Sequence, residues 1–153
     1  MRRTDGEIRN RVEIEEIIAN ATVCRLALSD NGQPYVVPMN FGYRDGALYF
    51  HSAPHGRKID IIGRNTRVCF EIDADIEIVR SDRPCEWSMR YRSVIGFGTA
   101  SLIESPAEKR SALAVIGKHY THLPFEVPDE QARRIAIIKV TIDEMTGKCS
   151  GCR

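Results

Sequence analysis

The amino-acid sequence predicts a mainly β (α+β) domain. In it a six- or seven-stranded antiparallel sheet closes, fully or in part, into a barrel with capping helices. Six or more apolar runs have the length of strands, and most are joined by short turns. Helical patterns occur only near the start, in the middle and late in the chain, so the regular strand and helix alternation of a parallel sheet is missing. A length of 153 residues corresponds to a single domain over 1–153.

The first predicted elements are a helix over residues 11–20 and a meander of strands. The apolar residues of the helix recur at spacings of three and four, which gathers them on one face: Ile14, Ile17, Ile18 and Ala21. Asn31-Gly32 and Asp45-Gly46 supply the positive φ angles that tight hairpin turns require. The strands predicted around and beyond these turns are 23–29, 35–43, 47–52, 67–72, 91–103 and 135–142.

Two later helices are marked by signals at their ends. The helix predicted over 56–63 stops at Gly63, a residue typical of helix C-termini. The next helix begins at Ser105-Pro106, where Ser105 is expected to cap the helix and Glu108 to reach back, and it runs to about His119. Residues 147–153 are expected to form a loose tail.

Composition excludes several classes of protein. The chain has 22 Lys and Arg against 21 Asp and Glu, so no global field attracts nucleic acid or an anionic membrane. It contains no run of 18 apolar residues and no visible export signal, so we expect a cytoplasmic protein without a membrane or nucleic-acid partner. Five cysteines is an odd number, which favours reduced, packed thiols at Cys24, Cys69 and Cys85 over a disulfide framework.

The stretch from His51 to Lys58 is the most informative for chemistry. It places a hydroxyl, a glycine and two adjacent cations where a strand gives way to a helix. A helix N-terminus offers free N–H groups to a phosphate, Arg57 can donate two parallel hydrogen bonds, and Lys58 adds a compact charge. The alternative is a solvated basic turn.

Two other stretches could approach a ligand. Pro38 interrupts the predicted strand 35–43, so the chain there lies on an edge or bulges, and Asn40 adds an amide beside it. On the strand 91–103, small residues share one face. That face permits close approach by a ligand ring or a second subunit, or else tight packing inside the barrel. Its residues are Val94, Gly96, Gly98 and Ala100.

Three residues near a predicted loop are candidates for substrate contact. Trp87 could cover a ligand from a partner subunit or could be a core residue, and Tyr91 shares this ambiguity. Arg92 could attract an anionic substrate.

The C-terminal Cys149-x-x-Cys152 has the spacing of zinc sites and of redox couples. For a zinc site, His119 and His122 would supply two further ligands. For a redox couple of the thioredoxin type, the first cysteine would have to lie at a helix N-terminus in another fold. We therefore expect a loose pair of thiols and no metal site.

The order of four segments resembles the pyridoxamine 5'-phosphate oxidase-related flavoproteins, and within them the nitroimidazole-resistance (Nim-type) branch. The segments are 37–41, 48–53, 56–58 and 93–98. The resemblance extends over nearly the whole chain and implies a split β-barrel homodimer. It also implies two flavin mononucleotide (FMN) sites at the subunit interface, each built by both subunits. The C-terminal substrate motifs of the true oxidases are missing, so vitamin synthesis is not expected.

The resemblance implies roles for individual residues. Arg57 and Lys58 would hold the FMN phosphate, and Ser93 would lie near the cofactor on a later strand. His51 and Ser52 would lie beside the flavin, with His51 as a catalytic proton donor, since imidazole titrates near neutral pH. The residues expected along the isoalloxazine ring are Val37, Pro38, Met39, Asn40 and Phe41.

These implications lead to one leading hypothesis and two alternatives. The leading hypothesis is an FMN-dependent oxidoreductase that reduces a small molecule such as a nitroaromatic or nitroimidazole compound, with NAD(P)H as a candidate electron donor. The first alternative is a flavin-binding sensor or carrier without turnover. The second keeps the barrel and replaces FMN with haem or a deazaflavin.

Overall fold

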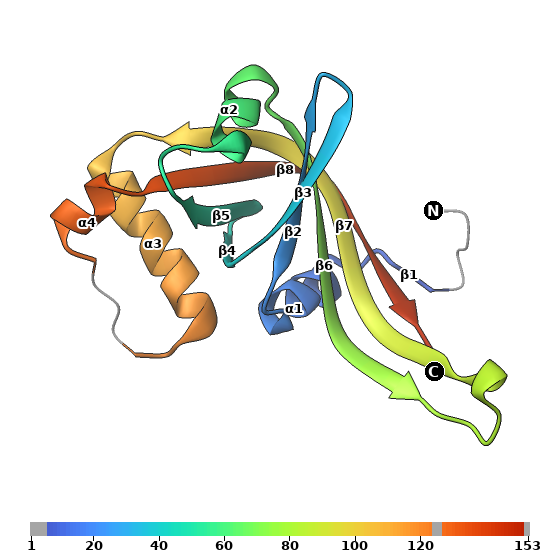
Figure 1. Ribbon diagram of the computed structural model, residues 1–153. Coiled ribbons are helices and arrows are strands. Elements are labelled where there is room, and N and C mark those ends of the chain that lie inside the picture. The colour runs from blue at the N-terminus through green and yellow to red at the C-terminus, as the bar shows by residue number, and fades with distance from the viewer. Residues whose placement is uncertain (1–5, 124–126, 152–153) are drawn as a thin grey trace.

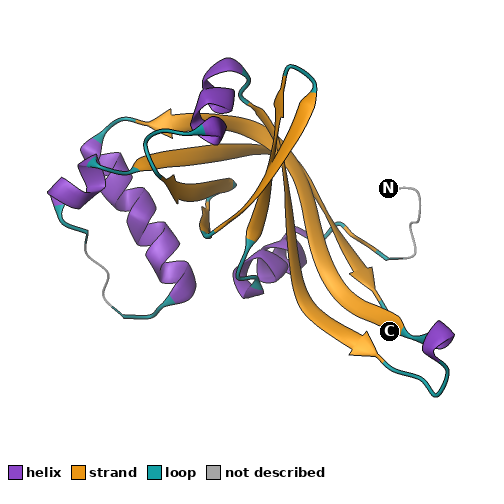
Figure 2. Ribbon diagram, in the orientation of Figure 1, coloured by secondary structure: helices purple, strands orange, loops and turns teal. Residues whose placement is uncertain are grey.

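An eight-stranded antiparallel sheet forms the centre of the computed structural model, which describes residues 6–123 and 127–151 (Figures 1 and 2). Seven of the strands pair in the order β3-β2-β6-β7-β8-β5-β4, and β1 pairs with β8. The strands are β1 (Glu7–Ile8), β2 (Cys24–Asp30), β3 (Gln33–Met39), β4 (Phe41–Arg44), β5 (Ala47–Ser52), β6 (Arg67–Val79), β7 (Ser88–Ile103) and β8 (Ala136–Ser150).

The predicted strand 35–43 is two strands, and this difference explains the barrel. β3 forms one edge of the paired path and β4 forms the other, yet only Asn40 separates them in the chain. Two edges joined by a single residue must lie close together, so the sheet curls round on itself. The predicted mainly β barrel is confirmed, with eight strands among the described residues in place of six or seven.

Helices cap this sheet. They are α1 (Arg11–Asn20), α2 (Arg57–Arg64), α3 (Pro106–Tyr120) and α4 (Asp129–Arg133), with a 3₁₀ turn at Pro84–Glu86. Ser105 is the N-cap of α3 and Pro106 is its first residue, as predicted, but the Ser105 side chain makes no capping hydrogen bond. No helix in the described ranges is both long enough and apolar enough to cross a bilayer.

The ends of β6, β7 and β8 extend beyond their predicted limits. The β6 and β7 pair continues outward as a long hairpin arm (Figure 1), here called the β6–β7 arm, which spans residues 75–91. The loose tail predicted for 147–153 is wrong for Gly147 to Ser150, because these residues continue β8 and pair with β7 as far as Tyr91. Cys149 therefore lies inside a strand and is disulfide-bonded, which also contradicts the predicted loose thiols. Residues 152 and 153 lie outside the described residues.

The interior is divided into two apolar clusters. The larger one lies within the barrel around Phe41, Phe50 and Phe70, all fully buried. The smaller one joins α3 to β5 and β8 through residues such as Ile116 and Ile137. The segment between β5 and α2 is thus held at both ends, because β5 and α2 each contribute residues to these clusters.

The small-residue face of β7 packs inside the barrel. A Cβ atom on Gly96 would lie within 3.0 Å of the Phe70 ring and 2.9 Å from the Glu144 carbonyl oxygen. Val94 and Ala100, on the same face, are buried. Of the two interpretations left open by the sequence, tight internal packing is therefore the one the structure shows.

The described free cysteines differ in burial, which predicts an order of reactivity. Burial raises the pKa of the Cys24 thiol strongly, and burial together with Glu71 raises that of Cys69, whereas Cys85 is exposed. Because the thiolate is the reactive form, we expect a thiol reagent to modify Cys85 first and Cys24 only after unfolding. Mass spectrometry of the labelled protein with and without urea would show this order, and rapid labelling of Cys24 in the folded protein would contradict it.

Candidate functional site

The predicted phosphate-binding segment lies between the end of β5 and the start of α2. Gly56 is the N-cap of α2 with φ at 121°, a conformation that favours glycine. No side chain caps this helix, and the Gly56 carbonyl accepts from the backbone N–H groups of Ile59 and Asp60. The first N–H groups of α2 are therefore not occupied by a capping side chain, which is the arrangement that favours an anion.

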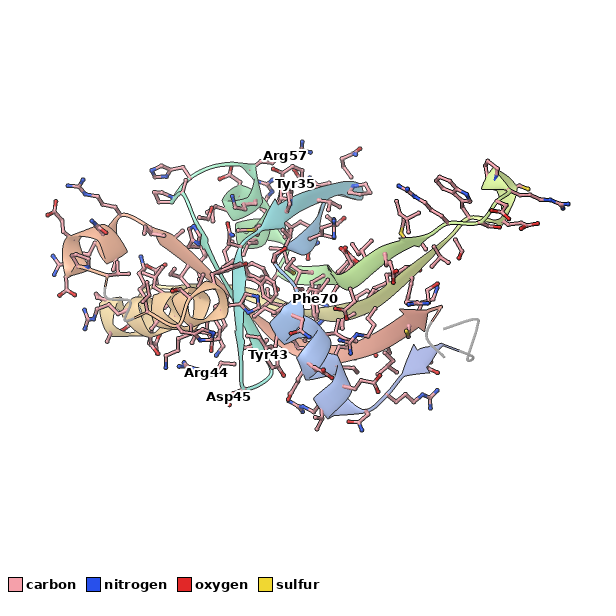
Figure 3. All side chains as sticks on the ribbon, turned by 90° about the horizontal axis from the view of Figure 1, so that it is seen from below. Tyr35, Tyr43, Arg44, Asp45, Arg57 and Phe70 are labelled. Atoms are coloured by element: carbon pink, nitrogen blue, oxygen red, sulfur yellow. The ribbon has the colours of Figure 1, made fainter. Side chains whose placement is uncertain are left out.

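Arg57 and Lys58 add positive charge at this helix start. The Arg57 guanidinium carbon lies 4.7 Å from the centroid of the Tyr35 ring, so a cation–π contact holds the arginine against β3 (Figure 3). Within the part of the chain that the structure describes, neither Arg57 nor Lys58 forms an ion pair with a carboxylate. Tyr35 was not predicted, although its place two residues before Val37 on the same strand face is a signal that could have found it.

Ser52, the last residue of β5, carries an unsatisfied polar atom. Its side-chain oxygen is the only buried side-chain N or O atom of the described residues that has no hydrogen-bond partner, and the residue is 8% exposed. Buried hydroxyl groups are normally hydrogen-bonded, so this oxygen fits a ligand or a bound water. Ser52, Arg57 and Lys58 together match the donors that a phosphate group requires.

His51 and Asn40 lie at the same end of the β4 and β5 pair. Phe41 is opposite Phe50 in the last pair of this ladder, so the adjacent residues Asn40 and His51 lie together just beyond it. Both side chains are exposed. The structure therefore brings the predicted amide and imidazole next to the segment that leads to α2.

The remaining residues predicted along the ring differ in what they can contribute. β3 is an edge strand with a continuous register against β2, so Pro38 lies on an edge, as one of the two predicted cases required, and not in a bulge. Pro38 is exposed and Val37 is half-buried. Met39 and Phe41 are buried in the core, so only their backbone groups remain for contact with a ligand.

Ser93 lies across the barrel wall from these residues in the same chain. It is opposite Lys148 on β8, whereas Ser52 is opposite Ala136 on the same strand. Twelve residues of strand correspond to a path of roughly 40 Å. Round the other side of the barrel the path is shorter. Val94, next to Ser93, is linked to Met39 through two intervening strands, which is a width of three strand spacings or about 15 Å.

The predicted substrate residues belong to the β6–β7 arm or its base. Trp87 is 46% exposed and donates from its indole nitrogen to the Ser81 carbonyl oxygen at 2.9 Å, so it is not a core residue. The Tyr91 ring lies beside Lys148, whose Nζ is 5.8 Å from the ring centroid.

The charge of Arg92 is compensated within the chain. Its Nε donates to Asp75 at 2.5 Å, and its Nη1 lies 3.6 Å from Glu16. Two adjacent carboxylates leave this arginine with little attraction for an anionic substrate.

An apolar row crosses the outer face of four neighbouring strands. Register places Val36 opposite Ala27, Ala27 opposite Cys69, and Cys69 opposite Phe97. Phe97 is 43% exposed and Ile95, two residues earlier on β7, is 47% exposed. The sequence interpretation missed this row, because it concerned the opposite, glycine-bearing face of β7.

No group of three His, Cys, Asp or Glu in residues 6–123 and 127–151 is arranged to hold a metal ion. The zinc alternative based on His119 and His122 therefore has no support among these residues.

Comparison with known proteins identifies the family. Residues 10–149 match the family model described as pyridoxamine 5'-phosphate oxidase. The chain belongs to the pyridoxamine 5'-phosphate oxidase family. This family assignment and the split barrel that it implies were predicted from the sequence and are confirmed.

Several members or structural neighbours of this family resemble the chain. A crystal structure from Bacteroides thetaiotaomicron, described as a candidate 5-nitroimidazole antibiotic resistance protein, is 41% identical with a TM-score of 0.84, over 94% of this chain and 86% of that one. An FAD and heme binding protein from Mycobacterium smegmatis is 20% identical with a TM-score of 0.83, over 96% and 74%. An FAD-binding protein from Mesorhizobium loti is 23% identical with a TM-score of 0.68, over 93% and 96%. The latter two share the fold.

A curated relative from Rhizobium meliloti (strain 1021), named an uncharacterized protein, is 34% identical over 65 residues. The matched stretch spans 42% of each chain. It adds no function to the family assignment.

Proposed function

We propose that this member of the family binds FMN at the start of α2 and uses it to reduce a small molecule. The observation that carries the proposal is the orphaned Ser52 hydroxyl beside a helix start with two uncompensated cations. Ser52, Arg57 and Lys58 would hold the phosphate. The edge strand β3, with Asn40 at its end, would lie along the ring system, and the bound flavin would supply the electron transfer.

We further propose a homodimer in which each flavin site takes residues from both subunits. The apolar row of Val36, Ala27, Cys69 and Phe97 is the kind of surface that a second copy would cover. The family resemblance, which implies FMN sites built by both subunits, supports this arrangement.

The dimer proposal predicts a monomeric variant. Phe97→Arg places a charge at the β7 end of the apolar row, so we expect the molecular mass measured by light scattering to fall from twice the chain mass to the chain mass. Val12→Arg, at an exposed position of α1, is the matched control and should leave the mass unchanged. A monomeric wild-type protein, or a dimeric Phe97→Arg variant, would rule out this interface.

His51 is proposed to donate a proton to the substrate during reduction. The exposed imidazole lies next to Ser52 and can be replaced without disturbing the core. General acid catalysis typically contributes about 10²- to 10⁴-fold, so His51→Gln should slow substrate reduction by at least about 100-fold. FMN affinity should change little, because glutamine retains a hydrogen-bonding group.

Stopped-flow measurement would separate these effects. The FMN-loaded protein and the His51→Gln variant are reduced and mixed with a 5-nitroimidazole, the substrate class suggested by the 41% identical relative. Equal rates of flavin reoxidation in the two proteins would remove His51 from the chemistry.

The function itself is tested in two steps. The absorption spectrum of freshly purified protein should show a flavin, and a haem or deazaflavin spectrum would replace the FMN proposal. Mixing with NADH or NADPH, followed by nitroaromatic compounds, should then show reduction and reoxidation. A bound flavin that no physiological donor reduces would indicate a sensor or carrier.

A further inference from the structure

A second cleft lies away from the start of α2. It is formed by the C-terminal end of α1, by β4 and by one face of α3, and its volume is about 600 Å³. In Figure 3, Tyr43 and Arg44 mark its β4 side, and Arg57 lies well apart from them. A volume of this size is in the range of small-molecule sites.

The polar groups that line the cleft are basic or neutral. Arg44 comes from β4, Lys118 and His119 come from the last turn of α3, and His122 follows that helix. No carboxylate is among its described lining residues. Because like charges gathered in a concave site repel one another, an anion bound there would be favoured.

Most of the positive charge in the cleft is not neutralised by nearby carboxylates. The Arg44 guanidinium donates to the Ser111 hydroxyl at 3.2 Å and lies 3.8 Å from Asp45, whose side chain is almost fully exposed. Glu15 accepts from the Tyr43 hydroxyl at 2.7 Å and is already paired with Arg11. In the described structure, Lys118 and His122 make neither a side-chain hydrogen bond nor an ion pair.

Hydrogen bonds hold the walls of the cleft in place. His119 Nε2 lies 2.7 Å from the Ala21 carbonyl oxygen, which can only accept, so this nitrogen carries a proton and donates it. The Tyr120 hydroxyl donates to the Thr22 carbonyl oxygen and accepts from the Phe41 N–H at 3.0 Å. These contacts join the end of α3 to the end of α1 and to β4, so little ordering is needed on binding.

We propose that this cleft, here called the α1–α3 cleft, binds a small organic anion with a carboxylate or phosphate group on an apolar body. Arg44 offers the planar fork that matches either group, and Lys118 adds a second charge. Ala19, Ala114 and Val115 supply an apolar surface for the rest of the molecule. This site is separate from the proposed flavin site and does not depend on it.

Three probes of similar size test the charge requirement. Benzoate, phenyl phosphate and neutral benzamide are titrated into ¹⁵N-labelled protein, and amide chemical shifts are followed by NMR. We expect benzoate or phenyl phosphate to shift resonances of residues 19–20, 43–44 and 111–122 and to bind at least tenfold more tightly than benzamide. Which of the two anions binds more tightly distinguishes a carboxylate ligand from a phosphate ligand.

Two matched double variants locate the binding. Arg44→Gln/Lys118→Gln should weaken anion binding at least tenfold, whereas Arg57→Ala/Lys58→Ala should leave it unchanged. Lys118→Glu is a second variant at an exposed position, and its thermal unfolding curve checks that the fold is retained. Shifts confined to the start of α2, equal binding of benzamide, or full affinity in Arg44→Gln/Lys118→Gln would each overturn the proposal.

Discussion

Replacing both Arg57 and Lys58 with alanine is expected to weaken FMN binding by at least about 100-fold. A hydrogen bond to a charged group typically contributes about 1.5 to 3 kcal/mol, and two such groups are lost. Arg57 is exposed, so the lower end of this range applies to it, and about 1.4 kcal/mol corresponds to tenfold in affinity. Quenching of FMN fluorescence during titration measures the change.

Arg64→Ala is the control for this experiment. Arg64 lies at the other end of α2 and pairs with Asp30 at 2.9 Å, so its loss removes one cation from the same helix without touching the helix start. Its FMN affinity should stay close to that of the wild type. Equal affinity of the double variant and this control would show that the phosphate is not bound at the α2 start.

The largest loss of stability is expected for Gly96→Ala. The added methyl group would overlap the fully buried Phe70 ring and approach the Glu144 carbonyl oxygen, and neither group can move without disturbing the sheet. Overpacking of this kind typically costs about 1 to 3 kcal/mol, and we expect the upper end of that range in the free energy of unfolding. Urea denaturation followed by circular dichroism measures it.

Gly63→Ala is the matched substitution. Gly63 is inside α2, and apart from its chain neighbours and the backbone of its own helix no atom lies within 4 Å of the position where a Cβ would be added. Alanine in place of glycine within a helix stabilises it by roughly 0.5 to 1 kcal/mol, so the sign should be opposite to that at Gly96. If Gly96→Ala were also neutral or stabilising, the packing described for β7 would be incorrect.

The local elements could be predicted because they depend on neighbouring residues. The turns at Asn31-Gly32 and Asp45-Gly46 have positive φ angles, with 51° at Asn31 and 52° at Asp45. The helix predicted over 11–20 is α1, and it buries Ile14, Ile17 and Ile18. Such signals act over a few residues and need no knowledge of the rest of the fold.

The candidate site was predicted in part for the same reason. The strand end at Ser52, the glycine at 56 and the two following cations are consecutive, so their order in the sequence already places them at one helix start. By contrast, the contact between Arg57 and Tyr35 joins α2 to a strand some twenty residues earlier. The loose tail was mispredicted because the pairing of β8 with β7 depends on a partner strand roughly 50 residues away.

The sequence alone determined the spacing of apolar residues in helices and strands, the turns, the helix ends and the order of the family segments. Only the tertiary structure decided which face of β7 is internal and that β3 and β4 form opposite edges. It also brought Arg44 and Lys118, which are distant in sequence, to one cleft. These facts depend on which strands pair and on the side chains that meet across them, and no local pattern contains that information.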